Sequence, residues 1–292
     1  MKFGLMFANT GPFASAAGVV EVAKVAEEVG FESLWTVEHV IWPEQYNSEY
    51  PYDPSGKMPG DASAPLPDPL IWLSFAAANT STIRLATGIL ILPERNPLVL
   101  AKSVSTLDVL SNGRLDLGIG VGWLEEEFDA LGIPFADRGR RTDDYVAAMR
   151  ALWAGDNASH HGEFASFEGV SSNPKPVNGS VPIVIGGHSK AAARRAGRIG
   201  QGFFPGRGSV EELTELIDVV HQTAADNGRD PGSIEITAPH PGILSDPVGA
   251  AQELASIGVA RAPLPAFLLL RGDAREAAAK LAETVIAPCA DI

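Results

Sequence analysis

The sequence has a single cysteine, no long apolar run and few basic residues. Cys289 is alone among 292 residues, so no disulfide can form within the chain. No segment approaches the ~18 consecutive apolar residues that indicate a transmembrane helix. The N-terminal run MKFGLMFANTG has no long apolar core of a signal peptide and is typical of a strand. We therefore expect a cytoplasmic protein that has no membrane partner.

Basic residues are outnumbered, with 22 Lys and Arg against 36 Asp and Glu and a net charge of -14. A strongly acidic surface repels nucleic acid and anionic membranes, so neither is expected as a partner. A phosphate-bearing ligand would need backbone N–H groups or a local basic cluster. Hydrophobic residues make up 45% of the chain, which is enough for a large core and argues against disorder.

Several motifs of catalysis are also missing. The adjacent His160 and His161 do not share a helix face, and there is no H-E-x-x-H run or cysteine cluster, so we expect no metal site. The sequence has no G-x-S-x-G elbow. Gly118, Gly120 and Gly122 resemble a dinucleotide fingerprint only weakly, because they follow the fourth expected strand rather than the first. Close approach of the backbone to a ring system, or a tight turn, explains these glycines better.

Short apolar runs alternate with helical patterns along the chain. The predicted strands cover residues 3–8, 33–37, 83–92, 115–119, 182–185, 203–204, 234–238 and 259–267. Each is followed by a helical pattern, several of which begin at a capping signal such as Asp68-Pro69, Asn96-Pro97 or Ser209 with Glu212. Eight such units favour a (β/α)8 barrel in one domain, residues 1–292. Polar insertions after the second and fourth strands, at about 43–67 and 155–180, are expected to cover the pocket.

The active site of such a barrel lies in the loops that follow the strands. Glu38-His39 follows the second strand and is the best acid/base pair, since a carboxylate beside a histidine can set its tautomer. The alternative is a histidine that only hydrogen-bonds its own loop. Arg138, Arg140 and Arg141 could reach an anionic substrate, or could lie in a solvated loop.

A second candidate lies between the fifth strand and its helix. In the run Gly186-Gly187-His188-Ser189, two glycines let a phosphate approach the backbone, and the helix N-terminus supplies N–H groups. Basic residues follow on that helix at Lys190, Arg194, Arg195 and Arg198. A tight turn followed by a solvated basic helix face is the alternative interpretation.

Read in order, these loops resemble the luciferase-like family of flavin- and deazaflavin-dependent oxidoreductases over nearly the whole chain. The most specific stretches are W-T-V-E-H at 35–39, L-A-T-G-I-L-I-L-P-E-R-N-P-L-V-L-A-K at 85–102, G-R-L-D-L-G-I-G-V-G-W at 113–123, G-I-P-F-A-D-R-G-R-R-T-D-D-Y at 132–145 and V-P-I-V-I-G-G-H-S at 181–189. The pattern is most similar to the actinobacterial group that uses the deazaflavin coenzyme F420. The resemblance implies a homodimer.

The resemblance also implies roles for individual residues. His39 would be the proton donor or acceptor, and Glu38 and Trp42 would flank the cofactor ring with it. The peptide bond between Gly88 and Ile89 would be cis and bulge under the ring. Further cofactor contacts are expected at Thr87, Gly120, Gly122, Trp123, Gly186, Gly187, His188 and Ser189. Related sugar-phosphate dehydrogenases carry an acidic residue where this chain has Trp123, which argues against a sugar-phosphate substrate.

We therefore expect an oxidoreductase that exchanges a hydride between F420 and a small organic substrate, with His39 handling the coupled proton. An FMN-dependent monooxygenase is the runner-up, because the same loops serve both cofactors. A barrel that binds a ligand without catalysis is a third reading, and the intact Glu38-His39 pair argues against it.

Overall fold

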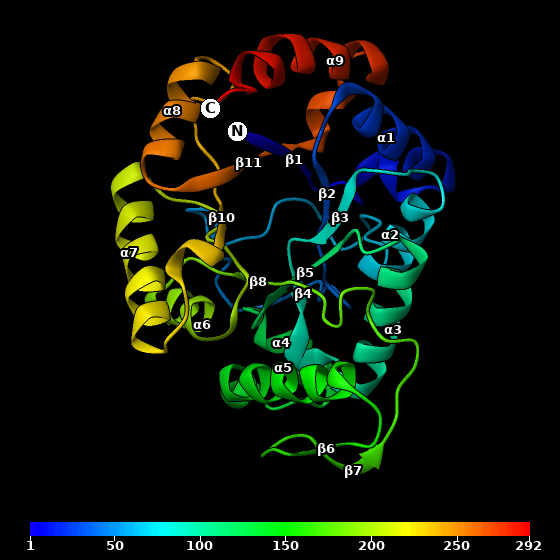
Figure 1. Ribbon diagram of the computed structural model, residues 1–292. Coiled ribbons are helices and arrows are strands. Elements are labelled where there is room, and N and C mark those ends of the chain that lie inside the picture. The colour runs from blue at the N-terminus through cyan, green and yellow to red at the C-terminus, as the bar shows by residue number, and fades with distance from the viewer.

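Eight parallel strand positions form a closed barrel in the computed structural model, which describes residues 1–292 (Figure 1). The nine strands are β1 (Lys2–Met6), β2 (Ser33–Thr36), β3 (Arg84–Thr87), β4 (Leu90–Ile91), β5 (Leu115–Gly120), β8 (Ile183–Gly186), β9 (Gly202–Phe204), β10 (Glu235–Thr237) and β11 (Val259–Pro265). β3 and β4 share one position, since both pair with β5. Their order is β3-β2-β1-β11-β10-β9-β8-β5, and β5 pairs back with β3 to close the ring. The predicted (β/α)8 barrel is confirmed, including its short sixth strand.

Helices surround the barrel on the outside (Figure 1). They are α1 (Ala16–Val29), α2 (Pro69–Ala77), α3 (Pro97–Leu110), α4 (Glu125–Leu131), α5 (Arg138–Ala154), α6 (Lys190–Ile199), α7 (Val210–Asp226), α8 (Pro247–Ser256) and α9 (Ala274–Leu281). Asp68 and Asn96 accept hydrogen bonds from the first free N–H groups of α2 and α3, and Ser209 with Glu212 forms a capping box. These side chains satisfy N–H groups that a helix leaves without partners. The sequence predicted each of these starts, whereas the short α4 was missed.

The third predicted strand, 83–92, is not continuous. The peptide bond Gly88-Ile89 is cis and separates β3 from β4, and a 3-10 turn, η2 (Leu92–Glu94), follows at once. The predicted strand was wrong here because apolar periodicity does not reveal a break in the middle of a buried run. The cis bond itself was expected from the family resemblance and is present.

The 155–180 insertion does not cover the strand ends, contrary to our expectation. It contains an antiparallel hairpin of β6 (Ala158–His161) and β7 (Ser166–Val170) that lies outside α5 (Figure 1). Asp144 of α5 accepts hydrogen bonds from the Phe164 and Ala165 N–H groups and pairs with His160. The hairpin therefore packs on the outer layer, away from the barrel mouth.

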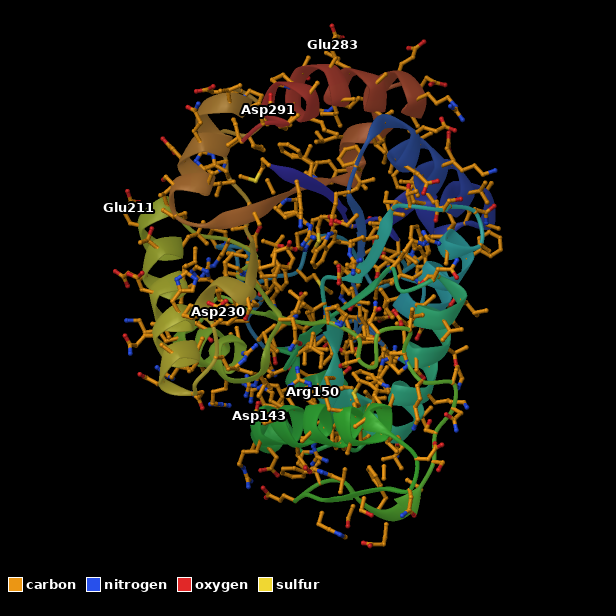
Figure 2. The ribbon with its side chains drawn as sticks, in the orientation of Figure 1. Asp143, Arg150, Glu211, Asp230, Glu283 and Asp291 are labelled. Carbon is orange, nitrogen blue, oxygen red and sulfur yellow. The ribbon has the colours of Figure 1, made fainter.

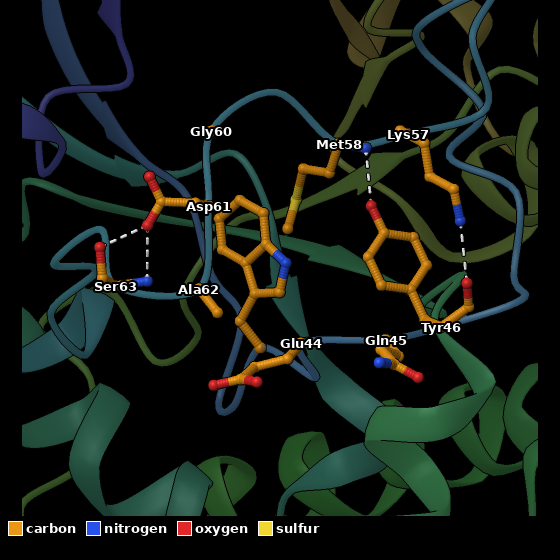
Figure 3. Close-up of a pocket in the computed structure, with 10 residues that line it drawn as sticks. Glu44, Gln45, Tyr46, Lys57, Met58, Gly60, Asp61, Ala62 and Ser63 are labelled. Carbon is orange, nitrogen blue, oxygen red and sulfur yellow. Dashed lines mark hydrogen bonds between the residues drawn. The ribbon is translucent and has the colours of Figure 1, made fainter.

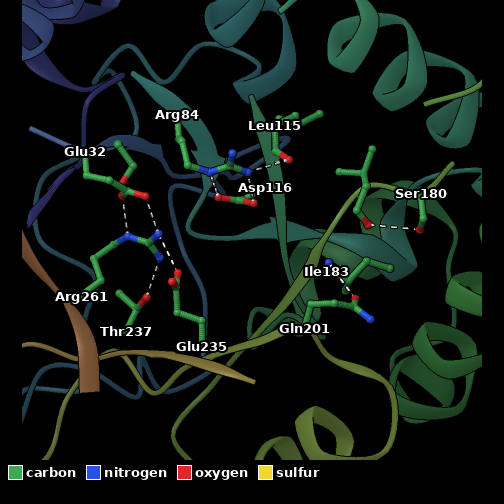
Figure 4. A network of polar contacts seen from close by, with 12 residues as sticks. Glu32, Arg84, Leu115, Asp116, Ser180, Ile183, Gln201, Glu235, Thr237 and Arg261 are labelled. Carbon is green, nitrogen blue, oxygen red and sulfur yellow. Dashed lines mark hydrogen bonds and ion pairs between the residues drawn. The ribbon is translucent and has the colours of Figure 1, made fainter. Parts of the chain in front are cut away.

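Ion pairs fill the amino-terminal end of the barrel (Figure 4). Arg261 is fully buried and pairs with Glu32 and Glu235 at 2.7 Å each, while Arg84 donates to Asp116 at 2.8 Å. These groups line a cavity of about 370 Å³ together with Lys2. Three basic and three acidic side chains balance there, so this end of the barrel is held by paired charges.

Glu211, Asp230, Glu283 and Asp291, labelled in Figure 2, are all exposed. None of the helices combines the length and the apolar character needed to span a membrane.

Candidate active site

Ile89 sits against two glycines at the carboxyl ends of β5 and β8. A Cβ atom at Gly120 would lie 2.6 Å from Ile89 Cδ1, and one at Gly186 would overlap Ile89 Cγ2. Only glycine leaves room for the side chain at both positions. The structure thus brings together Gly88, Ile89, Gly120 and Gly186, which the sequence had assigned to one face.

Thr87 and Gly122, which we expected to contact the cofactor, make contacts within the protein. Thr87 is fully buried, and its hydroxyl donates to the Gly118 carbonyl oxygen at 2.6 Å. Its hydroxyl hydrogen is therefore not available to a ligand. Gly122 has φ +80°, and a Cβ there would lie 2.6 Å from the Phe128 ring. That glycine allows a tight turn packed on α4.

His39 is held by Glu127 of α4. The distance from His39 Nδ1 to Glu127 Oε2 is 2.6 Å, and Glu127 Oε1 accepts from the Val40 N–H at 2.5 Å and the Ile41 N–H at 3.1 Å. The Glu127 side chain is completely buried, and that of His39 is 9% exposed. A carboxylate that accepts three N–H groups fixes the tautomer with hydrogen on Nδ1. His39 Nε2 makes no hydrogen bond within the protein and is free to exchange a proton.

Glu38 does not set this tautomer, contrary to our expectation. Its carboxylate accepts from the Ile91 N–H at 2.5 Å and pairs with Arg95, which also bonds Asp68 at 2.7 Å. The two side chains of the sequence pair therefore bind partners on different elements. Burial raises the pKa of Glu38, while Arg95 and the Ile91 N–H lower it in part. Glu38 therefore anchors the loop that begins with β4.

Four further aromatic rings gather next to His39. The ring centroids of His39 and Trp123 are 5.7 Å apart, and Trp42 lies 6.5 Å away on another side. Tyr46 and Tyr50 contact the Trp123 ring edge-on at 5.7 and 5.2 Å. The 43–67 insertion thus reaches the expected site, and two of its tyrosines form an aromatic cover on Trp123.

α4 also fixes the start of this insertion. Glu126 accepts from the Asn47 N–H at 2.6 Å and from the Ser48 hydroxyl at 2.7 Å. These bonds lower the pKa of Glu126 to about 2. The first turn of α4 therefore binds the loop that carries His39 and Trp42 at two places, residues 39–41 through Glu127 and residues 47–48 through Glu126.

A cavity of about 680 Å³ lies within this loop and is lined only by residues between 42 and 63, Trp42 among them. Figure 3 shows the labelled residues around it. Tyr46, Met58 and the acidic side chains of Glu44 and Asp61 face it as well. Lys57 donates to the Tyr46 carbonyl oxygen at 2.8 Å, so its amine is engaged. The cavity offers room for a small molecule next to Trp42, whose ring centroid is 6.5 Å from that of His39.

The loop after β8 has the features of an anion site. Gly187 has φ +125°, a backbone conformation that favours glycine. Ser189 is the N-cap of α6 and accepts from the Ala192 N–H. His188 Nδ1 is buried and has no hydrogen-bond partner. Burial and the nearby positive charge of Arg207 lower the pKa of His188, so the imidazole is neutral at neutral pH.

The basic face of α6 does not point to this loop, contrary to our interpretation. Arg195 and Arg198 both pair with Asp143 of α5, at 2.6 and 2.9 Å. Arg140 is likewise engaged by Asp137 and Glu163. The cation that acts on His188 is instead Arg207 of the loop after β9.

The sequence therefore missed Glu127 and Arg95 as members of this region. The run Glu125-Glu126-Glu127 directly follows a predicted site loop and was the available signal. Which of the three glutamates turns inward depends on the helix phase, which one short segment does not fix.

The sequence profile of the luciferase-like monooxygenases matches residues 1–285 of this chain. The chain belongs to this family. An uncharacterized protein of Mycobacterium tuberculosis is 33% identical over 210 residues, which cover 72% of each chain. An FMNH(2)-dependent dimethylsulfone monooxygenase of Pseudomonas fluorescens is 30% identical over 71% of this chain and 52% of its own length.

Solved structures agree with this membership. Monooxygenase RslO1 of Streptomyces bottropensis covers 99% of both chains with a TM-score of 0.73 and 26% identity. An F420-dependent secondary alcohol dehydrogenase, solved with an F420–acetone adduct, covers 98% of both chains with a TM-score of 0.77. Its sequence identity of 16% shows similarity of fold alone. Relatives that use either cofactor thus share this barrel, and the chain is an enzyme of the oxidoreductase and monooxygenase type.

Proposed function

We propose that this protein is an F420-dependent oxidoreductase that acts on a small organic substrate, with His39 as its proton donor or acceptor. The observation that carries the proposal is that His39 Nε2 is free while the buried Glu127 carboxylate holds Nδ1. Histidine exchanges protons near neutral pH and is suited to a reaction that couples a proton to a hydride.

The residues present fit such a cofactor. Ile89, Gly120 and Gly186 would support the ring, and Trp42 and Trp123 would border it. Gly187, Ser189 and the partnerless Nδ1 of His188 would receive the phosphate at the N-terminus of α6. When bound, a deazaflavin supplies a hydride, which is a two-electron transfer at carbon.

The chain's own residues perform the remaining tasks. Glu127 orients the His39 ring so that Nε2 faces the site and keeps the Nδ1 hydrogen in place. The aromatic cover of Tyr46, Tyr50 and Trp123 excludes water from the reacting atoms. The cavity that Trp42 and Tyr46 line would receive the substrate, and holding the substrate in place lowers the entropic part of the barrier.

An FMN-dependent monooxygenase is the second candidate. The observation that favours it is the likeness to the dimethylsulfone monooxygenase and to RslO1. Such an enzyme would use the same residues under the ring and the same loop after β8 for the phosphate. The aromatic cover on Trp123 would protect the reduced flavin from solvent. We favour F420 on the motifs quoted above.

Binding measurements distinguish the two. Purified apoprotein is titrated with F420 and with FMN while the fluorescence of its tryptophans is followed. We expect F420 to bind at least ten times more tightly. Tight binding of FMN without binding of F420 would replace the first proposal with the second. Binding of either cofactor without turnover of any substrate would favour a non-catalytic barrel.

We propose further that the protein is a homodimer in solution. Ile71 and Phe75 of α2 and Val99 of α3 are exposed by 74%, 45% and 65%, and the two helices pack side by side. An apolar face of this kind supports a protein contact. Sedimentation equilibrium tests it, and a monomer at all concentrations would contradict it.

A further inference from the structure

The inner face of the barrel can be followed from its amino-terminal end to the candidate active site. Lys2 of β1 and Arg261 of β11 line the cavity among the ion pairs, so their side chains point into the barrel. Side chains alternate along a strand, and β1 pairs with β11 without a shift from Lys2 opposite Arg261 to Met6 opposite Pro265. Met6 and Pro265 therefore also point inward, at the carboxyl end.

Met6 reaches the residues assigned to the cofactor ring. A Cβ atom built on Gly88 would lie 3.2 Å from Met6 Sδ and 3.0 Å from the Trp35 ring. Gly88 precedes Ile89, which packs against the glycines proposed to support the ring. Met6 and Pro265 are both partly exposed, so this part of the inner face is open to a ligand.

An apolar cluster fills the barrel beneath Met6. Its buried members are Trp35, Ala86, Val184 and Phe204. Trp35 donates its ring N–H to the Ser33 hydroxyl at 2.7 Å, and its ring lies 5.4 Å from the Arg261 guanidinium. The cluster thus separates the ion pairs at the amino-terminal end from Met6, and a ligand reaches Met6 from the carboxyl end.

The inward side chains at the carboxyl end carry no charge, hydroxyl or amide. They belong to Met6, Gly88, Gly120, Gly186, Phe204 and Pro265. The thioether of Met6 is the single acceptor among them, and a weak one. A charged group placed on this surface would lose its hydration without gaining a partner. An apolar group would gain from the same burial.

The rim next to Met6 is apolar as well. Phe7 has φ +62°, which a bulky residue rarely adopts, and it is 36% exposed. Phe267 is 56% exposed and lies in the 3-10 turn η5 (Ala266–Leu270), which follows β11. Neither η5 nor residues 7–13 contain a charged side chain. A strained backbone and exposed rings cost free energy without adding to the core, which indicates contact with a ligand.

We propose that the substrate is an uncharged molecule with an apolar body, and that Met6 is a residue that selects it. This proposal rests on the proposed function, which assigns the glycine side of the inner face to the cofactor ring. The apolar body would lie on Met6 and Pro265, with Phe7 and Phe267 at its edge. The polar group that reacts would face the free Nε2 of His39.

A matched set of ketones tests the substrate class. The probes are 2-butanone, 2-hexanone and 2-octanone, together with 5-oxohexanoate, in which a carboxylate replaces the end methyl group of 2-hexanone. Binding to the F420-loaded protein is followed by NMR of ¹³C-labelled methionine methyl groups, and Met6→Leu identifies the Met6 signal. We expect affinity to rise about three- to fourfold for each added CH2 group and 5-oxohexanoate to bind at least 10-fold more weakly than 2-hexanone. Affinity that does not rise with chain length, or tighter binding of the carboxylate, overturns the proposal.

Side-chain variants test the part played by Met6, with tryptophan fluorescence as the readout. Met6→Gln keeps the length of the side chain, adds an amide, and should weaken 2-hexanone binding at least 10-fold, whereas Met6→Leu should bind it like the wild type. Phe7→Ser, at an exposed position that the fold tolerates, should also weaken it. The control Leu110→Gln makes the same kind of change at a 68% exposed residue at the end of α3 and should have no effect. Unchanged affinity in Met6→Gln overturns the proposal, as does a loss confined to Met58→Gln, which would place the apolar body in the cavity of the 43–67 insertion.

The outcomes separate this proposal from the proposed function. Failure of F420 to bind would contradict the proposed function, and the ketones are then titrated into the free protein and the FMN-loaded protein, where the Met6 signal still reports binding. A Met6 signal that no ketone shifts in any of these forms overturns the substrate class. A Phe7→Ser protein that changes its association state but not its ketone affinity would assign the rim to a protein contact, which also overturns the proposal.

Discussion

Glu127 of α4 places its carboxylate 2.6 Å from Nδ1 of His39, across 88 positions of sequence. Replacing it with Gln keeps the size but presents an amide that can turn an N–H toward the ring. Nδ1 would then become an acceptor, and Nε2 would carry the hydrogen in the neutral ring. We expect Glu127→Gln to slow hydride transfer about 100-fold, because an analogous carboxylate-to-amide change in a protease triad gives the wrong tautomer.

The exposed neighbour Glu125 provides the control. Glu125→Gln removes the same charge from the same helical turn and should keep the wild-type rate. Nitrogen chemical shifts of His39 report the tautomer without cofactor. An unchanged tautomer in Glu127→Gln would contradict the role assigned to Glu127.

The contact between Ile89 and Gly120 predicts what a methyl group at position 120 would do. Gly120→Ala places a methyl group 2.6 Å from Ile89 Cδ1 and must displace that side chain. We expect cofactor affinity to fall at least 10-fold while the barrel stays folded. Gly155→Ala, where nothing lies within 4 Å of the new Cβ, should change nothing. Equal cofactor affinities for the two variants in a fluorescence titration would show that Ile89 does not support the cofactor ring.

His188 gives the binding of a phosphate-bearing cofactor a pH dependence. Burial and Arg207 lower its pKa in the free protein, and a phosphate dianion would raise it. Binding then takes up a proton between the two pKa values, so affinity should increase as the pH falls from 8 toward 6. His188→Ala should weaken binding and flatten the profile.

A deazaflavin chromophore without the phosphate tail is the control ligand for His188. Its binding should not depend on His188 or on pH in that range. A wild-type profile for F420 in His188→Ala would exclude His188 from the phosphate site.

Glu27 binds the segment that precedes β3, and its replacement tests how much these hydrogen bonds stabilise the fold. Its carboxylate accepts from the N–H groups of residues 81–83 and from the Thr82 hydroxyl, which lowers its pKa to about 2. A lowered pKa stabilises the fold above the unfolded value of 4.5, and this stability is lost as the pH falls toward 2. Glu27→Gln should lower the free energy of unfolding by about 1 kcal/mol at neutral pH. It should also flatten the decline between pH 4.5 and 2 in urea titrations. A variant as stable as the wild type at pH 7 would contradict this.

The sequence predicted what local patterns control. The βα alternation, the caps at Asp68 and Asn96 and the convergence of Gly120, Gly186 and His39 on one face follow from periodicity and from the geometry of a barrel. Pairs of residues that come together only when the barrel closes could not be predicted from the sequence. Glu38 was assigned to His39 as its neighbour in sequence, yet the fold gives His39 to Glu127 and Glu38 to Arg95. The hairpin of β6 and β7 was missed because its strands are short, polar and packed on a helix.

The central claim is that His39 moves the proton that accompanies hydride transfer to or from bound F420. It is tested most directly by single-turnover absorbance of F420 with wild type and His39→Ala, after each affinity has been measured. We predict that F420 binds both proteins within about threefold. The rate in His39→Ala should fall about 100- to 1,000-fold, which is the range of a lost acid/base group. An unchanged rate with F420 fully bound would contradict the account.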